Sequence, residues 1–133
     1  MSVTKKQYKV ITGRVAALSN NNVTTTVVTL TNPGNGYVVM WRAFCTSYDL
    51  NGSSSSTAFG GGLKGGAGSA AFITSGTSSP QTLRTLKQNC TVPPTWAVSI
   101  VSNDMVVRIT NPIANNVALD AIVVLEYTLV SNV

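Results

Sequence analysis

The chain has no histidine and few charged residues: of its 133 residues, nine are Lys or Arg and four are Asp or Glu. Histidine is the side chain that most often acts as a general base near neutral pH and most often binds metals. Glycoside hydrolysis needs two carboxylates that flank one bond, and the candidates are Asp49, Asp104, Asp120 and Glu126. Asp120 and Glu126 would lie about 20 Å apart along one strand face, too far for a catalytic pair. We therefore expect a protein that is not an enzyme and that holds neither a cofactor nor a metal.

Cysteine is scarce and no apolar run is long. Cys45 and Cys90 have neither the number needed for a disulfide framework nor the spacing of a zinc site, so buried free thiols are expected. The longest purely apolar run, residues 121–125, is too short to span a bilayer. Residues 1–6 lead into an alternating segment without the apolar core of a signal peptide. These absences predict a protein that is made in a cytoplasm, is not secreted and does not contact a membrane.

Charged residues make up 10% of the chain, against roughly 25% in a typical soluble domain. Hydrophobic residues make up 44%, which is enough for a folded core. Much of the surface must then consist of Ser, Thr, Asn and Gly, or be covered by other subunits. This composition is typical of a subunit in a larger assembly and equally of a Thr-rich β-protein, and composition alone does not separate the two.

The basic residues gather near the N-terminus. The net charge is +5, and four of the nine basic residues lie in the first fourteen positions: Lys5, Lys6, Lys9 and Arg14. Such a cluster suits phosphates or an acidic protein surface. The other five are scattered, without the basic stripe and interleaved aromatic residues of a nucleic-acid platform, so a protein-docking or solvated edge is favoured over nucleic-acid binding. Residues 1–14 are expected to be an extended basic arm or an edge strand.

The clearest structural signal lies in residues 96–110, where apolar side chains alternate with others. A two-residue loop at Asn103-Asp104 predicts a β-hairpin, because both residues tolerate positive φ. Side chains of a strand alternate between its faces. One face of the hairpin then collects six apolar residues: Trp96, Val98, Ile100, Met105, Val107 and Ile109. This pattern predicts a half-buried antiparallel sheet.

Other segments repeat the alternation between turn-forming residues: 5–15, 23–31, 37–48, 58–64, 70–73, 81–88 (a strand or one helical turn) and 117–129. Residues 37–48 carry substantial side chains on both faces, which indicates a central strand or one covered on its far side by a partner subunit. No segment of eleven or more residues has helical spacing. The prediction is one all-β domain over residues 1–133, an antiparallel β-sandwich of about seven or eight strands, with a jelly roll as the favoured topology.

Glycines and aromatic residues give weaker signals. The glycine-rich stretch 60–68 lacks the Gly-Lys-Ser or Gly-Lys-Thr ending of a phosphate loop, so bends and bulges are expected there. Trp41 and Trp96 fall on inward faces by alternation and are expected in the core. Tyr37 and Tyr48 lie beside turns, where they are free to contact a ligand.

Two stretches resemble a pattern found in small β-domains of tailed-bacteriophage virion proteins. They are Trp-Ala-Val-Ser-Ile-Val-Ser-Asn-Asp-Met-Val-Val-Arg-Ile-Thr at 96–110 and Ala-Ile-Val-Val-Leu-Glu-Tyr at 121–127, and the upstream segment 29–43 also fits. In such relatives the arrangement occurs in tail and tail-fibre proteins, and similar jelly-roll domains serve as capsid decoration or cement proteins. The resemblance implies a structural protein of the virion.

Three hypotheses follow from the residues and the resemblance together. The first is a capsid decoration protein, a homotrimer or homodimer that binds the major capsid protein and docks through Lys5, Lys6, Lys9 and Arg14. The alternative is a tail or fibre-tip module that binds a host-surface glycan or receptor through Tyr37 and Tyr48. The third is a coat protein whose basic N-terminus contacts packaged nucleic acid.

Overall fold

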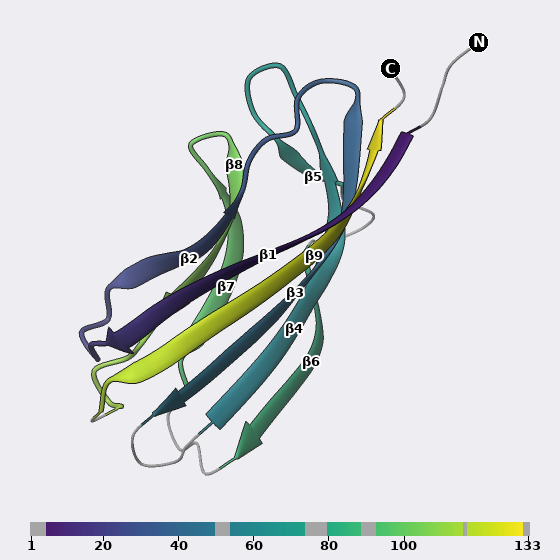
Figure 1. The fold of residues 1–133 in the computed structure, drawn as a ribbon. Helices are drawn as coiled ribbons and strands as arrows, with labels where there is room; N and C mark the ends of the chain where they lie inside the picture. The colour runs from purple at the N-terminus through teal and green to yellow at the C-terminus, as the bar shows by residue number, and fades with distance from the viewer. Residues whose placement is uncertain (1–4, 50–53, 74–79, 89–92, 116, 132–133) are drawn as a thin grey trace.

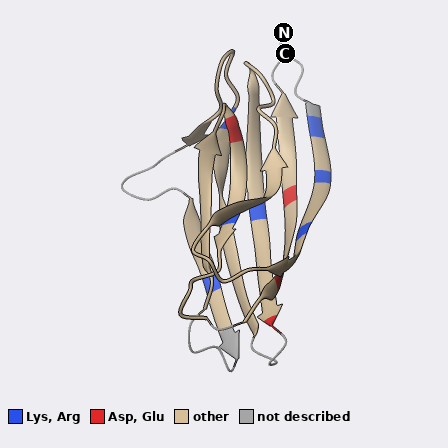
Figure 2. Ribbon diagram, turned by 90° about the vertical axis from the view of Figure 1, so that its left-hand side faces the viewer, with Lys and Arg blue, Asp and Glu red and all other residues tan. Residues whose placement is uncertain are grey.

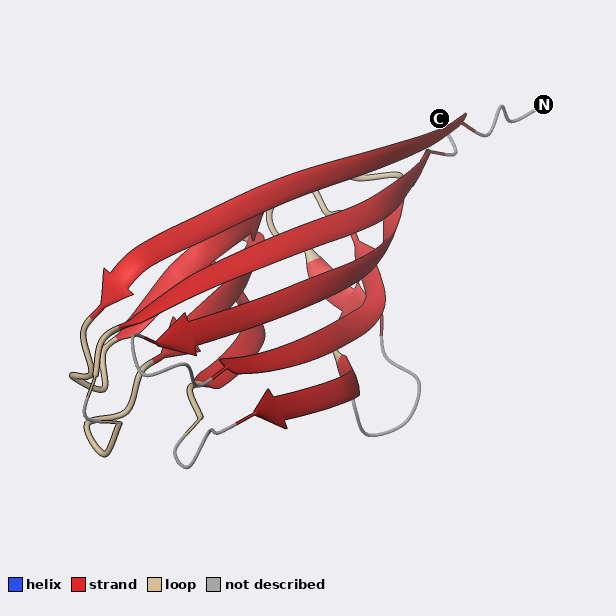
Figure 3. Cartoon of the chain, turned by 60° about the horizontal axis from the view of Figure 1, so that its bottom comes forward, coloured by secondary structure: helices blue, strands red, loops and turns tan. Residues whose placement is uncertain are grey.

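The computed structural model describes residues 5–49, 54–73, 80–88, 93–115 and 117–131, which form nine strands and no helix (Figures 1 and 3). The strands are β1 (Lys5–Leu18), β2 (Thr24–Leu30), β3 (Tyr37–Asp49), β4 (Ser54–Lys64), β5 (Ala71–Ile73), β6 (Gln81–Gln88), β7 (Thr95–Val101), β8 (Asp104–Thr110) and β9 (Leu119–Ser131). Within these ranges there is no helix that is long and apolar enough to cross a membrane.

The strands form two antiparallel sheets that pack face to face (Figure 1). One sheet has six strands in the order β1-β9-β3-β4-β5, with β6 also paired to β4, and the other has the order β2-β8-β7. The predicted antiparallel β-sandwich is confirmed. Pairing of the first strands with the last, β1 with β9 and β2 with β8, is that of a jelly roll, whereas β3–β4 and β7–β8 are hairpins that stay within one sheet.

The strand count is nine instead of seven or eight, because weakly patterned segments pair with a strong neighbour. β6 pairs along β4, so residues 81–88 are a strand and not a helical turn. β4 begins at Ser54, four residues before the expected strand 58–64. There the buried hydroxyls of Ser47 and Ser55 lie 2.7 Å apart, so a hydrogen bond replaces the apolar contact that the sequence lacks.

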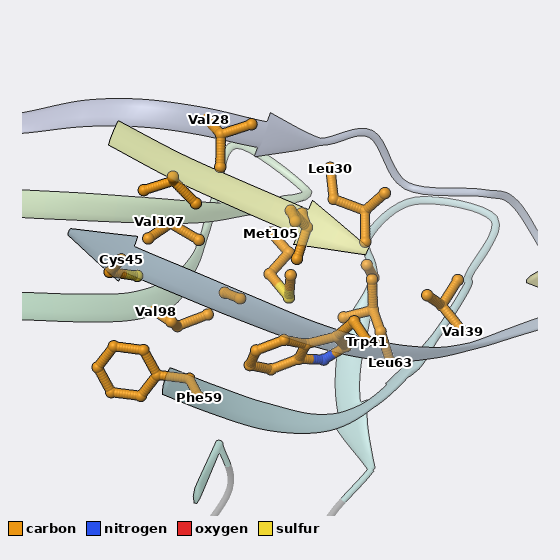
Figure 4. Packing of buried hydrophobic residues seen from close by; sticks show 14 residues of the cluster. Val28, Leu30, Val39, Trp41, Cys45, Phe59, Leu63, Val98, Met105 and Val107 are labelled. Carbon is orange, nitrogen blue, oxygen red and sulfur yellow. The ribbon is translucent and has the colours of Figure 1, made fainter. Parts of the chain in front are cut away.

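The core lies between the two sheets and is built on β3 (Figure 4). The predicted inward face of this strand is confirmed, with every member below 5% exposure: Val39, Trp41, Ala43 and Cys45. Leu63 and Phe59 extend this layer on β4, while Val107 and Met105 meet it from β8. Gly61 lies opposite Trp41, and a Cβ at this glycine would be 3.2 Å from the indole ring. The predicted core position of Trp41 therefore depends on a glycine beside it.

The β7–β8 hairpin has the predicted faces, but the prediction of its turn was wrong by one residue. The loop residues are Ser102 and Asn103, with φ of 49° and 77°, and Val101 pairs with Asp104. Asp104 begins β8, and its carboxylate accepts a hydrogen bond of 2.8 Å from the backbone N–H of Asn32. The shifted turn moves the pairing of β7 with β8 by two residues, so every side chain stays on its predicted face. The six apolar residues therefore still face the core.

β1 is an edge strand and not a free arm, because it pairs with β9 from Lys5 to Leu18. At Gly13 it passes close to β2, where a Cβ would lie 2.0 Å from the Val27 carbonyl oxygen. Any side chain at this position would push the two strands apart. Gly13 thus lets the edge of one sheet approach the other.

Hydrogen bonds of Asn32 hold the glycine-rich stretch to the connection between β2 and β3. Asn32 donates through Nδ2 to the Gly66 carbonyl at 2.9 Å, and its Oδ1 accepts from the N–H groups of Gly34 and Gly66. A Cβ at Gly65 would lie 2.0 Å from the Gly34 carbonyl oxygen. The glycines therefore permit two backbone segments to approach each other closely. This fits the bends and bulges that the sequence predicts for a glycine-rich stretch without a phosphate-loop ending.

Asn111 performs a similar role at the opposite end of the sandwich and generates a stability prediction. It is fully buried, its Nδ2 donates to the carbonyls of Leu18 and Val117 at 3.0 and 3.1 Å, and its Oδ1 accepts from Asn115 at 2.8 Å. Asn111→Ala should lower the free energy of unfolding by about 3 kcal/mol, because buried carbonyls lose their donors. Asn35→Ala, at an exposed turn position, should change it by less than about 0.5 kcal/mol in the same denaturant titration. Equal effects of the two substitutions would contradict this role.

Cys45 generates a second prediction, since the structure has it as a buried free thiol, as expected. Burial raises the pKa of its thiol to about 12, because the thiolate loses its hydration. Iodoacetamide at about pH 8 should therefore leave Cys45 unmodified in the folded protein and modify it after unfolding in guanidinium. Peptide mass spectrometry locates the label, and rapid native alkylation of Cys45 would count against the described core. Cys90 lies outside the described residues.

Candidate interaction surface

The six-stranded sheet has one face that no other described element covers (Figures 1 and 3). On β3, alternate side chains point into the core, and the others point to this outer side. The outward side chains include Met40, which is 60% exposed, and Phe44, which is 39% exposed. The sequence pattern of β3 indicates a central strand or one that a partner covers. The structure has it between β9 and β4 with its outer side uncovered.

The strand register aligns the outward side chains in rows across the sheet. One row, from β1 to β5, contains Tyr8, Thr128, Met40, Gly62 and Ile73. Another, from β1 to β6, contains Thr12, Val124, Phe44, Ala58 and Arg84. Side chains directly opposite each other on neighbouring strands touch, so these rows form one continuous surface.

The outer side carries nine large exposed apolar side chains: Tyr8, Val10, Val38, Met40, Phe44, Tyr48, Ile73, Leu83 and Leu86. We call this surface, together with the partly buried Ile122, Val124 and Val130 between them, the outer apolar face. Gly60 lies opposite the outward Arg42, so a Cβ at Gly60 would point to the outer side. That Cβ would be 2.9 Å from the Leu83 Cδ1 atom, which places Leu83 on the outer apolar face as well. Five strands of up to 14 residues give the whole outer side, its polar and charged residues included, a plane of about 40 by 20 Å, or roughly 800 Å². That is about the area that each partner contributes to a standard protein–protein interface.

A polar group lies within the outer apolar face. The Tyr8 hydroxyl donates to Glu126 Oε2 at 2.7 Å, and Arg42 Nη1 is 4.0 Å from Glu126 Oε1. The hydrogen bond to Glu126 raises the pKa of Tyr8, because it favours the protonated phenol. A shallow hollow of about 210 Å³ lies between these three side chains, Met40 and Thr128. The group therefore offers a carboxylate, a guanidinium and an aromatic ring to a molecule that docks there.

The other outward carboxylate is too far from Glu126 to act with it. Asp120 lies six residues earlier on β9, about 20 Å away, as the strand spacing predicts. It accepts a hydrogen bond from the Ala17 N–H at 2.8 Å and pairs with Arg14 at 3.7 Å. Within the described part of the chain, no three His, Cys, Asp or Glu side chains gather in a way that could hold a metal ion.

The predicted basic docking residues are strung along β1 and do not share one face. Lys6 and Arg14 are on the same side as Tyr8, whereas Lys9 is an exposed residue on the opposite side by alternation. Lys5 is the first residue of β1 and pairs with Ser131. From Lys6 to Arg14 the basic residues follow the edge of the sheet (Figure 2), over about 26 Å at the usual rise of a strand. Lys6, Lys9 and Arg14 thus do not form one compact patch, and the docking role of the four basic residues stays a prediction.

The two tyrosines predicted to contact a ligand lie at opposite ends of β3. Tyr37 begins the strand, and Tyr48 is the next-to-last residue, so about 36 Å separates them. They are too far apart to stack on one sugar, and a ligand contact by either tyrosine stays a prediction. Tyr48 is 46% exposed at one end of the outer apolar face, beside a small hollow that Ala17 and Asp120 also line.

Comparisons with known proteins give little. No family model matches the chain, and no curated protein matches it significantly. Among solved structures, the tailspike protein of Acinetobacter baumannii phage AM24 is similar, with a TM-score of 0.46 and 7% sequence identity. The matched region covers 98% of this chain and 26% of the tailspike, so the chain spans about a quarter of that protein's length.

The two sides of β3 should differ sharply in their contribution to stability. Val39→Ala should lower the free energy of unfolding by about 2 kcal/mol, because Val39 is fully buried. Met40→Ser should change it by less than about 0.5 kcal/mol, since the Met40 side chain stays 60% exposed in the folded protein. Urea unfolding of the two neighbouring variants checks this. A large loss from Met40→Ser would mean that the outer side chains serve the fold itself.

Proposed function

We propose that this protein is a non-enzymatic structural component of a bacteriophage virion, most specifically a decoration protein that binds the major capsid protein at capsomer junctions. The observation that carries the proposal is the uncovered outer apolar face. Monomeric soluble proteins rarely expose continuous apolar patches of more than a few hundred Å². The phage context comes from the resemblance of residues 96–110 and 121–127 to virion β-domains.

Such a protein would stabilise the shell by binding to its assembled form. Burying the outer apolar face against capsid subunits removes apolar surface from water and favours the intact head by mass action. The sandwich suits this role because its own core, between the sheets, is complete without the outer face. Symmetric sites on a shell favour matching oligomers, so a homotrimer or homodimer is proposed, with copies that meet through other surfaces.

The use of the carboxylates supports a structural role. Asp104 holds the Asn32 backbone, Asp120 binds Ala17 and Arg14, and Glu126 accepts from Tyr8. Each of these acids fixes the position of a neighbouring element or side chain. This use of the acids supports the proposal of a protein that works by binding.

A tail or fibre-tip module that binds a host-surface glycan is the second candidate. It is favoured by the hollow beside Tyr8, Arg42 and Glu126, because carboxylate and guanidinium groups hydrogen-bond sugar hydroxyls and an aromatic ring packs on a sugar face. In this alternative, that group would replace Tyr37 and Tyr48 as the ligand contact.

Addition of the purified protein to heads that lack it tests the proposal. The protein should co-sediment with the heads and raise their melting temperature in calorimetry, because it binds the assembled shell and not its separated subunits. The tail or fibre-tip alternative predicts binding to a glycan array or host cells and no effect on heads. Absence of binding to heads together with glycan binding would contradict the decoration role.

A further inference from the structure

Resting on the proposed function, we infer that the outer apolar face docks on a flat, largely apolar protein surface that carries acidic side chains opposite Lys6, Lys64 and Arg84. The partner is thus the shell and neither a second copy of this chain nor nucleic acid. The inference rests on how charge is distributed over the face. Its carboxylates are engaged within the molecule, whereas several of its cations are not.

Five basic side chains and two carboxylates lie on the outer side of the six-stranded sheet. The strand register assigns them: Lys6, Arg14, Arg42, Lys64 and Arg84, with Asp120 and Glu126. Both acids already have partners, since Asp120 pairs with Arg14 and Glu126 with Arg42. No acid on the described outer side is therefore left to attract a basic partner.

Three cations on this side have no such partner. Of the described carboxylates, none lies within salt-bridge distance of Lys6, Lys64 or Arg84. Lys6 is on the edge strand β1 and Arg84 is on the edge strand β6, while Lys64 ends β4. Lys6 and Lys64 share one row at the end of the sheet, through Val130 and Val38. The unpaired charge thus lies at one end of the outer side and along its β6 edge, beside the apolar side chains.

This distribution of charge favours one class of binding partner for the outer apolar face over the others. A second copy would offer only engaged carboxylates to these cations, so it supplies no complement to their charge. Nucleic acid needs a cationic groove that follows the phosphates and rings that stack on bases. Here aliphatic and thioether side chains such as Val10 and Met40 separate the cations, and the Glu126 carboxylate lies among them. A protein surface with an apolar area and acidic side chains opposite the unpaired cations complements both features.

Lysine footprinting on purified virus particles tests the inference. In the particle, acylation of Lys6 and Lys64 should be several-fold slower than in the free protein, because docking buries the outer side. Lys9 lies on the same strand as Lys6 but on its opposite side, so its labelling rate should be unchanged. Equal protection of Lys9, or full reactivity of Lys6 and Lys64 in the particle, would overturn the inference.

Charge-reversal variants provide a second test of the inference. Lys6→Glu combined with Lys64→Glu should weaken attachment to heads by roughly tenfold or more, whereas Lys9→Glu should leave it unchanged. Met40→Glu should also abolish attachment, and Thr26→Glu, an exposed position on β2, is its matched control. All four variants alter exposed side chains, and circular dichroism checks that each one folds.

The outcomes separate the inference from the proposed function. Wild-type attachment that is insensitive to the Lys6 and Lys64 variants contradicts the inference but leaves the proposed function intact. A protein that is absent from particles and adds to no heads contradicts the proposed function. Self-association of the wild type that Met40→Glu abolishes in sedimentation would show that a second copy covers the face. Salt-sensitive binding to plain DNA that the Lys6 and Lys64 variants abolish would instead support nucleic acid.

Discussion

The period of two along β3 is the constraint on which the rest of the structure depends. One set of its side chains builds the core with β4, β8 and β9, and the other set forms the middle of an uncovered face. Because strand pairing fixes neighbours in register, β9 and β4 must present the same two sides as β3. The core and the outer apolar face are therefore consequences of one register. A slip of one residue would exchange Trp41 for Met40 and disrupt both.

The ends of the sandwich are held by side chains that bond to the backbone. Asn32 links the connection between β2 and β3 to the glycine-rich stretch, and Asn111 donates to the carbonyls of Leu18, the last residue of β1, and Val117, which precedes β9. Amide side chains of this kind satisfy backbone groups that have no ladder partner. Two carboxylates do the same, since Asp104 accepts from the Asn32 N–H and Asp120 from the Ala17 N–H.

Much of the fold could be predicted from the sequence, because alternation in residues 37–48, 96–110 and 117–129 is strong. The inward faces follow directly from it. The turn at Ser102-Asn103 could not be placed, since Asp104 is fixed by Asn32, which is 72 residues earlier in the chain. The edge position of β1 was one of two predicted alternatives, and the choice depends on its long-range pairing with β9.

The candidate site was less predictable than the fold. The apolar outer side of β3 was visible in the sequence, as was the possibility of a covering partner. The group of Tyr8, Arg42 and Glu126 was not, because it joins β1, β3 and β9 and depends on a register that no local pattern reveals. For the same reason, Lys6 and Lys9 are separated by the sheet although they are close in sequence.

A cryo-electron microscopy reconstruction of the intact particle tests the central claim most directly. The account predicts density for this sandwich with the outer side of β1, β9, β3, β4 and β6 against acidic and apolar residues of the shell. The three-stranded sheet should then face away from that contact. Density in which the outer side of β3 faces solvent, with attachment through another surface, would contradict the account.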